Sequence, residues 1–478
     1  MKRRGKKLIA LCAALAILLG LYASVATLTA DPEESEPVTV AALTADDLVS
    51  LSWTNADDGT LELVRGSADE DWSYASDSDF PVDQSYPEAM LTALQEVSAS
   101  VEIDAPSDLS DYGLEEPGMT ITATGSDGGQ TTFSIGNENE MTGEYYLSCS
   151  AQEGKVYLVG TSLTDAFAYD LYDLVQMEEI PPFGQIDSLT VESGSGALAL
   201  EYLEDSTGHT YNPTEFHWFL QSGDTLRAVD TTEAETLTGS LTGLSWMQCT
   251  DYKAEDDELV EYGLDDASAT RVQLTYQDAD DEDAEEEGES KTFTLLLGKD
   301  TDTATYARLG DSRMVYLIST DTADALRYAA WSSLRPSAVC TIDPDQIEEI
   351  EITVDGETRT ITFEGTATEE VTDENGETTT QTVSVYRWNG EELPSAEVDA
   401  LVSALNGLTV TGETTAAQGE EIITVTIRQK VEGYEELTLR LTAQDAATAC
   451  AEFGGETLLT DRSAADTLAS SARALFED

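Results

Sequence analysis

The stretches DLSDYGLEEP (residues 108–117) and ELVEYGLDDA (residues 258–267) are two copies of one short phrase, 150 residues apart. Leu109 matches Leu259, the Tyr-Gly-Leu triplet at 112–114 matches that at 262–264, and acidic residues flank both triplets. A repeated phrase indicates either a recurring site or a duplicated fold, and the residues around it decide between the two.

Strand-like patterns surround the phrase and recur three times along the chain. Three segments alternate apolar and polar residues, which is the period of a strand, and each leads through a short turn to a second alternating segment. Asp58–Gly59 and Asp355–Gly356 are typical of hairpin turns between such strands. The opening segments are 46–53, 185–193 and 346–354, and their partners are 61–66, 197–203 and 358–365.

A helix is expected near the middle of each unit, where apolar residues follow a spacing of four and then three. This spacing lies on one helix face, and its recurrence makes coincidence a poor explanation. Asp83, Asp230 and Ser395 stand near the helix starts as candidate caps. A second helix is expected near 161–175, 320–334 and 462–476. The apolar triplets are Met90, Leu94 and Val97; Leu237, Leu241 and Leu244; and Leu401, Leu405 and Leu408.

The patterns predict an α+β fold of tandem units of antiparallel sheet with helices. The Tyr-Gly-Leu phrase lies between the two halves of a unit, so we interpret it as a structural connector with a positive-φ glycine and a docked tyrosine and leucine. An acidic binding loop is the alternative. The third unit lacks the phrase and is expected to be a degenerate copy. The predicted parts are 1–30 (membrane anchor or signal peptide), 31–41 (acidic linker), 42–180, 185–338 and 346–478 (repeat units), with boundaries near 178–184 and 334–344.

The charge balance limits the partners of this protein. Its 478 residues include 23 Lys+Arg and 95 Asp+Glu, for a net charge of −72. Such a surface repels phosphate backbones, so nucleic-acid binding is disfavoured. We favour the interpretation that the acid is a solvating surface that keeps the protein soluble; basic proteins or divalent cations are the alternative partners. The acidic segments 278–289 and 365–381 are expected to be solvated loops that lengthen hairpin turns. Neither has the spacing of an EF-hand, so only weak divalent-cation association is expected.

Residues that often carry chemistry do not form a recognisable site here. Cys149, Cys249, Cys340 and Cys450 are widely scattered and are expected to be small core residues, whereas Cys12 lies in the apolar N-terminus. His209 and His217 cannot by themselves form a zinc centre. Gly194-x-Gly196-x-x-Ala199 resembles a dinucleotide fingerprint, but the repeat predicts a hairpin there. We therefore expect no enzyme activity, no cofactor, and no catalytic, cofactor-binding or metal-ligating residues.

The N-terminus predicts export. The sequence MKRRGKK is followed by 23 uncharged residues, Leu8–Ala30, and then by acidic residues. A helix of this length spans a bilayer, and the basic cluster keeps its start in the cytoplasm. An uncleaved anchor is favoured; a signal peptide cleaved near Ser24-x-Ala26 is the alternative. The expected location is the cell membrane, with a single pass and the bulk of the chain extracytoplasmic.

Several short motifs resemble a known family. Trp72-x-Tyr74, Phe80–Asp83 (FPVD), Phe133–Asn137 (FSIGN), VYLV at 156–159 and LYDLV at 171–175, together with the phrase at 109–117, resemble the bacterial domain-of-unknown-function family 4340. The resemblance covers 42–180 most fully, extends over 185–335 and weakens beyond 346. The family has no established activity, so no residue roles are carried over. Some members are encoded beside ABC-type transporters, which implies an accessory role in the envelope.

These observations lead to two expectations about function. The first is a non-enzymatic, extracytoplasmic, membrane-anchored scaffold or accessory subunit of a cell-envelope or ABC-transporter complex. Its partners would be the membrane and an ABC-type transporter or another envelope protein. The second is a cell-surface sensor or ligand-binding module.

Overall fold

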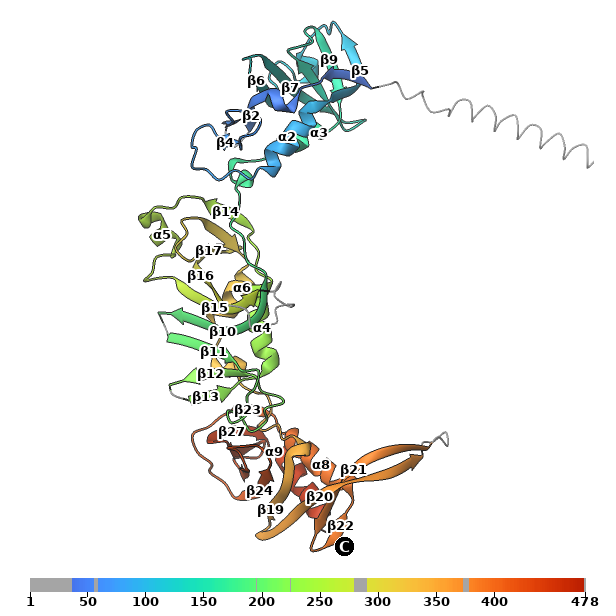
Figure 1. Cartoon of the computed structure of the whole chain (residues 1–478), viewed down its shortest axis with the longest axis vertical. Helices are drawn as coiled ribbons and strands as arrows, with labels where there is room; N and C mark the ends of the chain where they lie inside the picture. The colour runs from blue at the N-terminus through green and yellow to red at the C-terminus, as the bar shows by residue number, and fades with distance from the viewer. Residues whose placement is uncertain are drawn as a thin grey trace, which may run out of the picture. The chain divides into compact units, whose positions relative to one another are not determined.

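The computed structural model describes residues 37–55, 59–194, 196–223, 225–278, 290–372 and 378–476. The chain divides into two compact units between Glu178 and Glu179. The first unit contains the first repeat and the second contains the other two, and each unit is described by itself (Figure 1).

The first repeat is an antiparallel sheet with two helices. Over the described residues its nine strands follow the order β1-β5-β9-β8-β7-β6-β2-β3-β4. The strands are β1 Val38–Ala41, β2 Leu48–Asn55, β3 Gly59–Val64, β4 Ser73–Tyr74, β5 Val97–Asp104, β6 Met119–Gly125, β7 Gln130–Asn139, β8 Glu144–Cys149 and β9 Lys155–Val159, and the helices are α2 Ser85–Gln95 and α3 Ser162–Ala166.

The second repeat has the same plan, with the described strands in the order β13-β12-β11-β10-β15-β16-β17-β18-β14. The strands are β10 Phe183–Ser193, β11 Gly196–Tyr202, β12 Trp218–Ser222, β13 Thr225–Ala228, β14 Gln248–Asp251, β15 Thr270–Asp278, β16 Lys291–Asp300, β17 Thr305–Leu309 and β18 Val315–Ile318. The helices are α4 Thr231–Thr242, α5 Asp256–Tyr262, α6 Thr320–Arg327 and α7 Trp331–Leu334.

The third repeat orders its described strands β22-β21-β20-β19-β24-β25-β26-β27-β23. The strands are β19 Ile347–Val354, β20 Glu357–Thr372, β21 Thr378–Trp388, β22 Glu391–Leu393, β23 Val410–Glu413, β24 Glu421–Gln429, β25 Glu436–Ala443, β26 Thr448–Phe453 and β27 Glu456–Asp461. The helices are α8 Ser395–Asn406 and α9 Arg462–Ala474.

Among the described strands the three sheets share one topology except at the edges of the first, where β1 is added beyond β5 and one strand in place of two follows β3. In each, the opening strand (β2, β10 or β19) lies between its hairpin partner and the strand that begins the second half of the repeat. The described part of the third sheet has as many strands as the other two, so the degeneracy expected for 346–478 does not extend to the sheet. What the third repeat lacks is the Tyr-Gly-Leu phrase.

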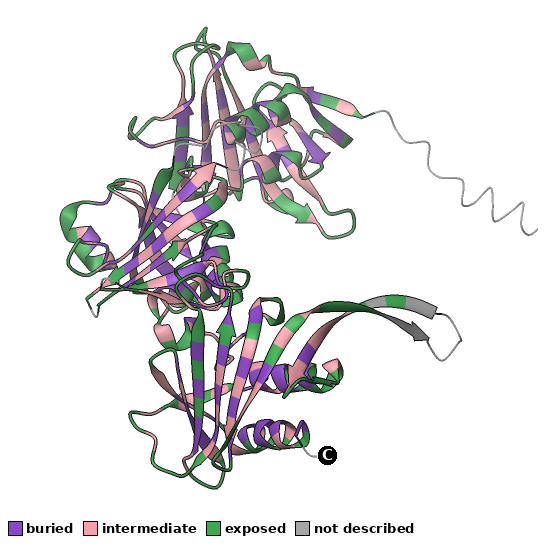
Figure 2. Ribbon diagram, turned by 60° about the horizontal axis from the view of Figure 1, so that its bottom comes forward, coloured by how far each residue is buried: buried purple, intermediate pink, exposed green. Residues whose placement is uncertain are grey.

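Helices cover one face of each sheet, and the core lies between the two layers. In the second repeat α4 and α6 pack on β10, and in the third α9 packs on β19 and β24 beside α8. Figure 2 shows buried residues along the strands of the third sheet and along its helices. The apolar side chains of the alternating strands point to this face, and burying each one contributes roughly 1.5–3 kcal/mol.

The helical triplets are confirmed in their first two members and wrong in the third. Val97 opens β5, and Leu244 and Leu408 lie just after α4 and α8. All three are buried, with exposed fractions of 4%, 8% and 0%. The apolar spacing extends past the end of each helix because the backbone turns back there and places its next apolar residue against the same core. Gly243 and Gly407 follow α4 and α8 as C-caps.

The candidate caps are confirmed at one helix. The Asp230 carboxylate accepts hydrogen bonds from the amides of Thr232 and Glu233, at 3.0 and 3.3 Å, at the start of α4. The N-cap of α2 is Gln84 and not Asp83, and that of α8 is Pro394 and not Ser395. The sequence therefore located these two helix starts to within one residue.

The repeated phrase forms a helix end with a left-handed glycine. Gly113 and Gly263 have φ of 69° and 71° and follow a turn of 3-10 helix (Ser110–Tyr112) and α5. The amide of the next leucine reaches back to the carbonyl of Leu109 at 3.0 Å or of Leu259 at 2.8 Å, which is a Schellman closure. Leu114 and Leu264 are buried, with exposed fractions of 7% and 0%. The connector interpretation is therefore correct.

The tyrosine of each phrase packs on the following hairpin. The rings of Tyr112 and Tyr146 lie 5.0 Å apart, and those of Tyr262 and Tyr306 lie 4.8 Å apart. A Cβ atom at Gly136 of β7 would lie 2.1 Å from the Tyr112 carbonyl oxygen, and one at Gly298 of β16 would lie 2.3 Å from that of Tyr262. The phrase therefore has a second conserved position within the repeat, a glycine on the strand beneath it.

The segment 365–381 was expected to be a loop, and this expectation is wrong. Thr366 to Thr372 and Thr378 to Ser384 continue β20 and β21 as a paired hairpin that extends past the sheet (Figure 1). The segment joins β20 to β21, the second and third strands of the repeat. Its threonines and valine favour strands, and this preference outweighs the acidic residues. We call residues 365–385 the arm.

Several smaller predictions can be checked against the structure. Ser193 pairs with Gly196 in the β10–β11 hairpin, so the glycine fingerprint is a turn. Asp355 and Gly356 have φ of 54° and 79°, as a type I′ hairpin turn requires. Buried cysteine side chains are found at the four expected core positions, Cys149, Cys249, Cys340 and Cys450.

Two further predictions concern the ends of the repeats. The boundary at 334–344 does not separate compact units, because Val339, Cys340 and Ile342 are buried in the core of the third repeat. The acidic segment that begins at Asp278 joins β15 to β16, and its residues 279–289 lie outside the described residues.

The anchor or signal peptide of 1–30, Cys12 and most of the linker 31–41 also lie outside the described residues. Within the described ranges, none of the helices has the length and apolar character needed to cross a membrane.

Candidate functional site

The loop between β11 and β12 joins the second repeat to the third. This loop, residues 203–217, is longer than the corresponding connection of the first repeat, residues 65–72. The side-chain amide of Asn212 donates to the carbonyl of Thr341 at 2.9 Å, and the Tyr434 hydroxyl donates to the carbonyl of His209 at 2.9 Å. The loop is thus bonded to two separate segments of the third repeat. We call it the junction loop.

Tyr211 is the centre of this contact. Its hydroxyl accepts a hydrogen bond from the Thr341 amide at 3.2 Å, and its carbonyl accepts one from the Gln429 side chain at 3.0 Å. Its ring meets the Phe453 ring edge-on, with centroids 5.2 Å apart. Burial raises the pKa of the Tyr211 hydroxyl well above its ordinary value. The residue therefore stays neutral and fixes the two repeats by packing and hydrogen bonding.

A cavity of about 200 Å³ lies beside the junction loop. Its walls come from the junction loop, from β13, from the segment that begins with α7, and from the β26–β27 turn of the third repeat. Most of its lining is aromatic or aliphatic, with Phe216, Trp331, Phe453 and Leu458 as the large side chains. We call it the junction cavity. A concave apolar site between repeats with a few charged groups is typical of small-molecule binding.

Arg227 is one of two arginines in the wall, and it is already fully engaged. Its guanidinium carbon lies 3.7 Å from the centroid of the Trp331 ring, and its Nη2 donates to the Glu456 carboxylate. Cation–π stacking and the ion pair together hold the side chain flat against the wall.

Arg335 is the second arginine, and it is engaged only weakly. Its Nη1 lies 3.7 Å from a carboxylate oxygen of Glu413, outside hydrogen-bond range. The side chain is 17% exposed, and Nη1 is buried with no hydrogen-bond partner among the described residues. A buried N–H group without an acceptor is unfavourable, so Arg335 is the less satisfied of the two arginines in the wall.

Both histidines lie in the junction loop, but their surroundings differ. His209 lines the junction cavity. The Nδ1 atom of His217 lies 3.1 Å from the Leu203 carbonyl oxygen, and its ring stacks on Tyr202. No three His, Cys, Asp or Glu side chains of the described residues converge as a metal cluster. The weak cation association expected from the acidic segments stays a prediction.

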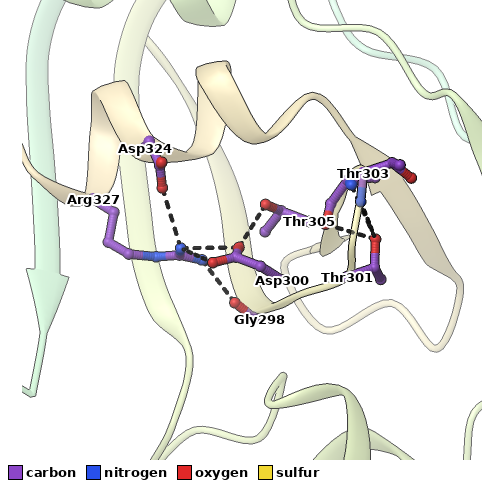
Figure 3. Close-up of polar contacts among 8 residues, drawn as sticks. Gly298, Asp300, Thr301, Thr303, Thr305, Asp324 and Arg327 are labelled. Carbon is purple, nitrogen blue, oxygen red and sulfur yellow. Dashed lines mark hydrogen bonds and ion pairs between the residues drawn. The ribbon is translucent and has the colours of Figure 1, made fainter.

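Asp300 and Arg327 form a polar cluster in the second repeat (Figure 3). Nη1 of Arg327 donates to both Asp300 carboxylate oxygens, at 3.1 and 3.2 Å, and Nη2 donates to the Gly298 carbonyl at 2.7 Å. The Thr305 hydroxyl donates to Asp300 at 2.7 Å. This bond first, and Arg327 next, lower the pKa of the Asp300 carboxyl. The cluster fastens α6 to β16 and β17, so we assign it a structural role.

Sequence reasoning named no site residues, and it missed the junction cavity. The lining residues lie between His209 and Ala228, between Trp331 and Val339, at Val410 and Tyr434, and between Phe453 and Leu458, and only packing brings these segments together. One signal was available: residues 205–217 contain both histidines and have no counterpart in the first repeat. A long insertion in one copy of a repeat is where a repeat protein places specific contacts.

One protein-family model matches the chain twice, in tandem, as the repeats do. The family model described as "Domain of unknown function (DUF4340)" matches residues 72–252 and again residues 218–422. The matches begin at Trp72, just before β4, and at the equivalent Trp218 of β12, so each runs across a repeat border. No curated protein matches the chain. Because the two matches together cover more than half of the chain, the protein belongs to the DUF4340 family.

Proposed function

We propose that the protein is a non-enzymatic scaffold or accessory subunit of a cell-envelope complex built around an ABC-type transporter. In this proposal residues 8–30 anchor the chain in the membrane, and the repeats lie outside the cytoplasm. The arm is the observation that carries the proposal.

The arm does not take part in the sheet of its own repeat. Beyond Gly365 its strands pair with each other and no longer with β19 or β22. At about 3.4 Å per residue, residues 365–372 extend roughly 25 Å past the sheet. Ordering this backbone costs conformational entropy. Contact with another protein would offset that cost, since exposed strand edges accept a further strand.

The repeated sheets also favour a scaffold. Tandem copies of one sheet provide extended surfaces, as in other repeat proteins that hold partners. A net charge of −72 suits a partner with basic surface loops and keeps the repeats away from anionic lipid headgroups.

Removing the arm tests the proposal. One variant replaces residues 364–385 by Asn-Gly, which joins Phe363 to Tyr386 where these residues already pair. The matched control deletes the acidic segment 279–289. Each chain is crosslinked in intact cells, purified from membranes and analysed by mass spectrometry. We expect wild type and control to retain an ABC-type permease and the armless chain to lose it. Equal recovery by all three chains, or recovery of no permease, would contradict the proposal.

Location is tested separately. Protease added to intact, wall-stripped cells should digest residues beyond 31 and leave the anchor in the membrane. Full protection of the chain would refute the extracytoplasmic location. A mature N-terminus at Thr27 would refute only the anchor and would favour a cleaved signal peptide.

The junction cavity favours a second candidate function, a sensor or ligand-binding module of the cell surface. Its aromatic wall and its weakly engaged arginine are features of a ligand site and have no evident use in a purely mechanical scaffold. A rise of melting temperature with a small-molecule ligand would support this function, because a ligand that binds only the folded state stabilises it.

A further inference from the structure

We infer that the junction cavity binds a small amphipathic carboxylate, with the carboxylate on Arg335 and an aromatic or branched aliphatic body against Trp331 and Phe216. The inference rests on the second proposed function, the ligand-binding module, and adds the chemical class of the ligand.

The charge of the site selects an anion. The chain has only 23 Lys+Arg among 478 residues, yet two arginines line this one cavity. Glu456, the carboxylate of the wall, is already paired with Arg227. Arg335 is left with Glu413 at 3.7 Å and with an Nη1 that has no hydrogen-bond partner among the described residues. The Arg335 side chain is 17% exposed, and a ligand carboxylate that takes the place of Glu413 gains a two-point contact with the guanidinium fork.

The wall selects the rest of the ligand. Phe216, Trp331, Phe453 and Leu458 present apolar surface, and Trp331 is held in place by the stacked Arg227. A volume of about 200 Å³ lies below the range of drug-sized pockets, so the ligand is small. A carboxylate is favoured over a phosphate because Arg335 carries a single positive charge, and a dianion would face the surplus acid of the surface.

The probe for this inference is 3-phenylpropanoate. Its uncharged analogue, 3-phenylpropanol, keeps the ring and the chain length and removes the carboxylate. The full chain is held in lipid nanodiscs, and binding is measured by titration calorimetry against empty nanodiscs. We expect the acid to bind at least about tenfold more tightly than the alcohol, as for a hydrogen bond to a charged group.

Substitutions of Arg335 test whether this residue recognises the carboxylate. Arg335→Gln should weaken binding of the acid at least about tenfold and leave binding of the alcohol unchanged. Arg335→Lys should retain part of the preference for the acid. The matched control, Arg440→Gln, removes the same charge from the surface of the third repeat, where Arg440 is paired with Glu421 and Glu452, and should bind like wild type.

A further variant guards against a folding defect. Leu226→Trp fills the cavity from β13 without changing a charge, and it should block both probes. Each variant is melted without ligand first.

Two results would overturn the inference. Equal affinity for acid and alcohol, unchanged in Arg335→Gln, would show a ligand cavity with no carboxylate recognition and would leave the ligand-binding function standing. No binding of either probe at millimolar concentration, or binding that persists in Leu226→Trp, would remove both the inference and the ligand-binding function of this cavity.

Discussion

Only glycine fits at positions 136 and 298, because the carbonyl oxygen of the connector tyrosine lies directly against the strand there. The sequence showed the phrase and the positive-φ glycine within it, since both depend on local backbone conformation. It did not show the second glycine, because that constraint arises only when β7 or β16 folds beneath the connector. A helical or hairpin glycine and a glycine at a close contact look the same in a sequence.

Replacing Gly298 by alanine tests this contact. The new Cβ would lie 2.3 Å from the Tyr262 carbonyl oxygen and 2.9 Å from Cγ of Leu264, so the connector or the strand must move. We expect a loss of roughly 1–3 kcal/mol in the free energy of unfolding, measured in urea. Gly239→Ala is the control, because Gly239 lies inside α4 with no atom within 4 Å of the added Cβ. It should gain about 0.5–1 kcal/mol. A Gly298→Ala protein as stable as wild type would disprove the close approach.

Elements were predictable where their period is regular, and less so at their ends. The strands of the second half of each repeat alternate clearly, and all of them are present. The helices end just before the last residue of their apolar spacing, because Val97 already belongs to β5 and Leu244 and Leu408 lie in the turns after α4 and α8. The arm was misread because acidic composition outweighed the threonine-rich strand pattern in the prediction. Pairing across the hairpin, which composition does not reveal, decides its structure.

The Arg327 cluster shows how an element is fixed to its sheet. Arg327→Met should destabilise the second unit by roughly 1–2 kcal/mol at pH 7, a value kept low because Asp300 is 43% exposed. The lowered pKa of Asp300 means that the pair stabilises the fold above the unfolded-state pKa, about 3.9, and that this contribution fades as pH falls through the folded-state pKa.

Thermal melts of wild type and Arg327→Met from pH 7 to pH 3 check this cluster. The difference in melting temperature should narrow below about pH 4 but persist in part, because the bond to the Gly298 carbonyl has no titrating acceptor. Arg462→Met, which removes an exposed helical pair with Asp466, should change stability by less than about 0.5 kcal/mol. A difference that widened in acid would contradict the assigned sign.

On the scale of the whole molecule, the tandem organisation was readable from the sequence, but the unequal coupling of the repeats was not. The first repeat stands alone as a compact unit, whereas the junction loop joins the other two. The reason lies in a loop insertion whose partners are more than 100 residues away. The junction cavity was unpredictable for the same reason.

Calorimetry should therefore show two unfolding transitions. The second unit should absorb roughly twice the enthalpy of the first, since unfolding enthalpy scales with the number of residues. Tyr211→Ala removes the ring between the repeats and should split or broaden the larger transition only. Tyr328→Ala is the control, because Tyr328 is 69% exposed. A single cooperative transition of the wild-type chain would show that all three repeats are coupled.

The open edges of the arm also bear on the solubility of the protein. Each strand of the arm has one neighbouring strand, so its outer edge can accept a strand from another copy of the chain. At neutral pH a net charge of −72 keeps the copies apart. As acidification approaches the isoelectric point of about 4.1, that repulsion disappears while the edges remain. The protein should then aggregate edge to edge, and a chain with a shortened arm should remain dispersed in the same acid.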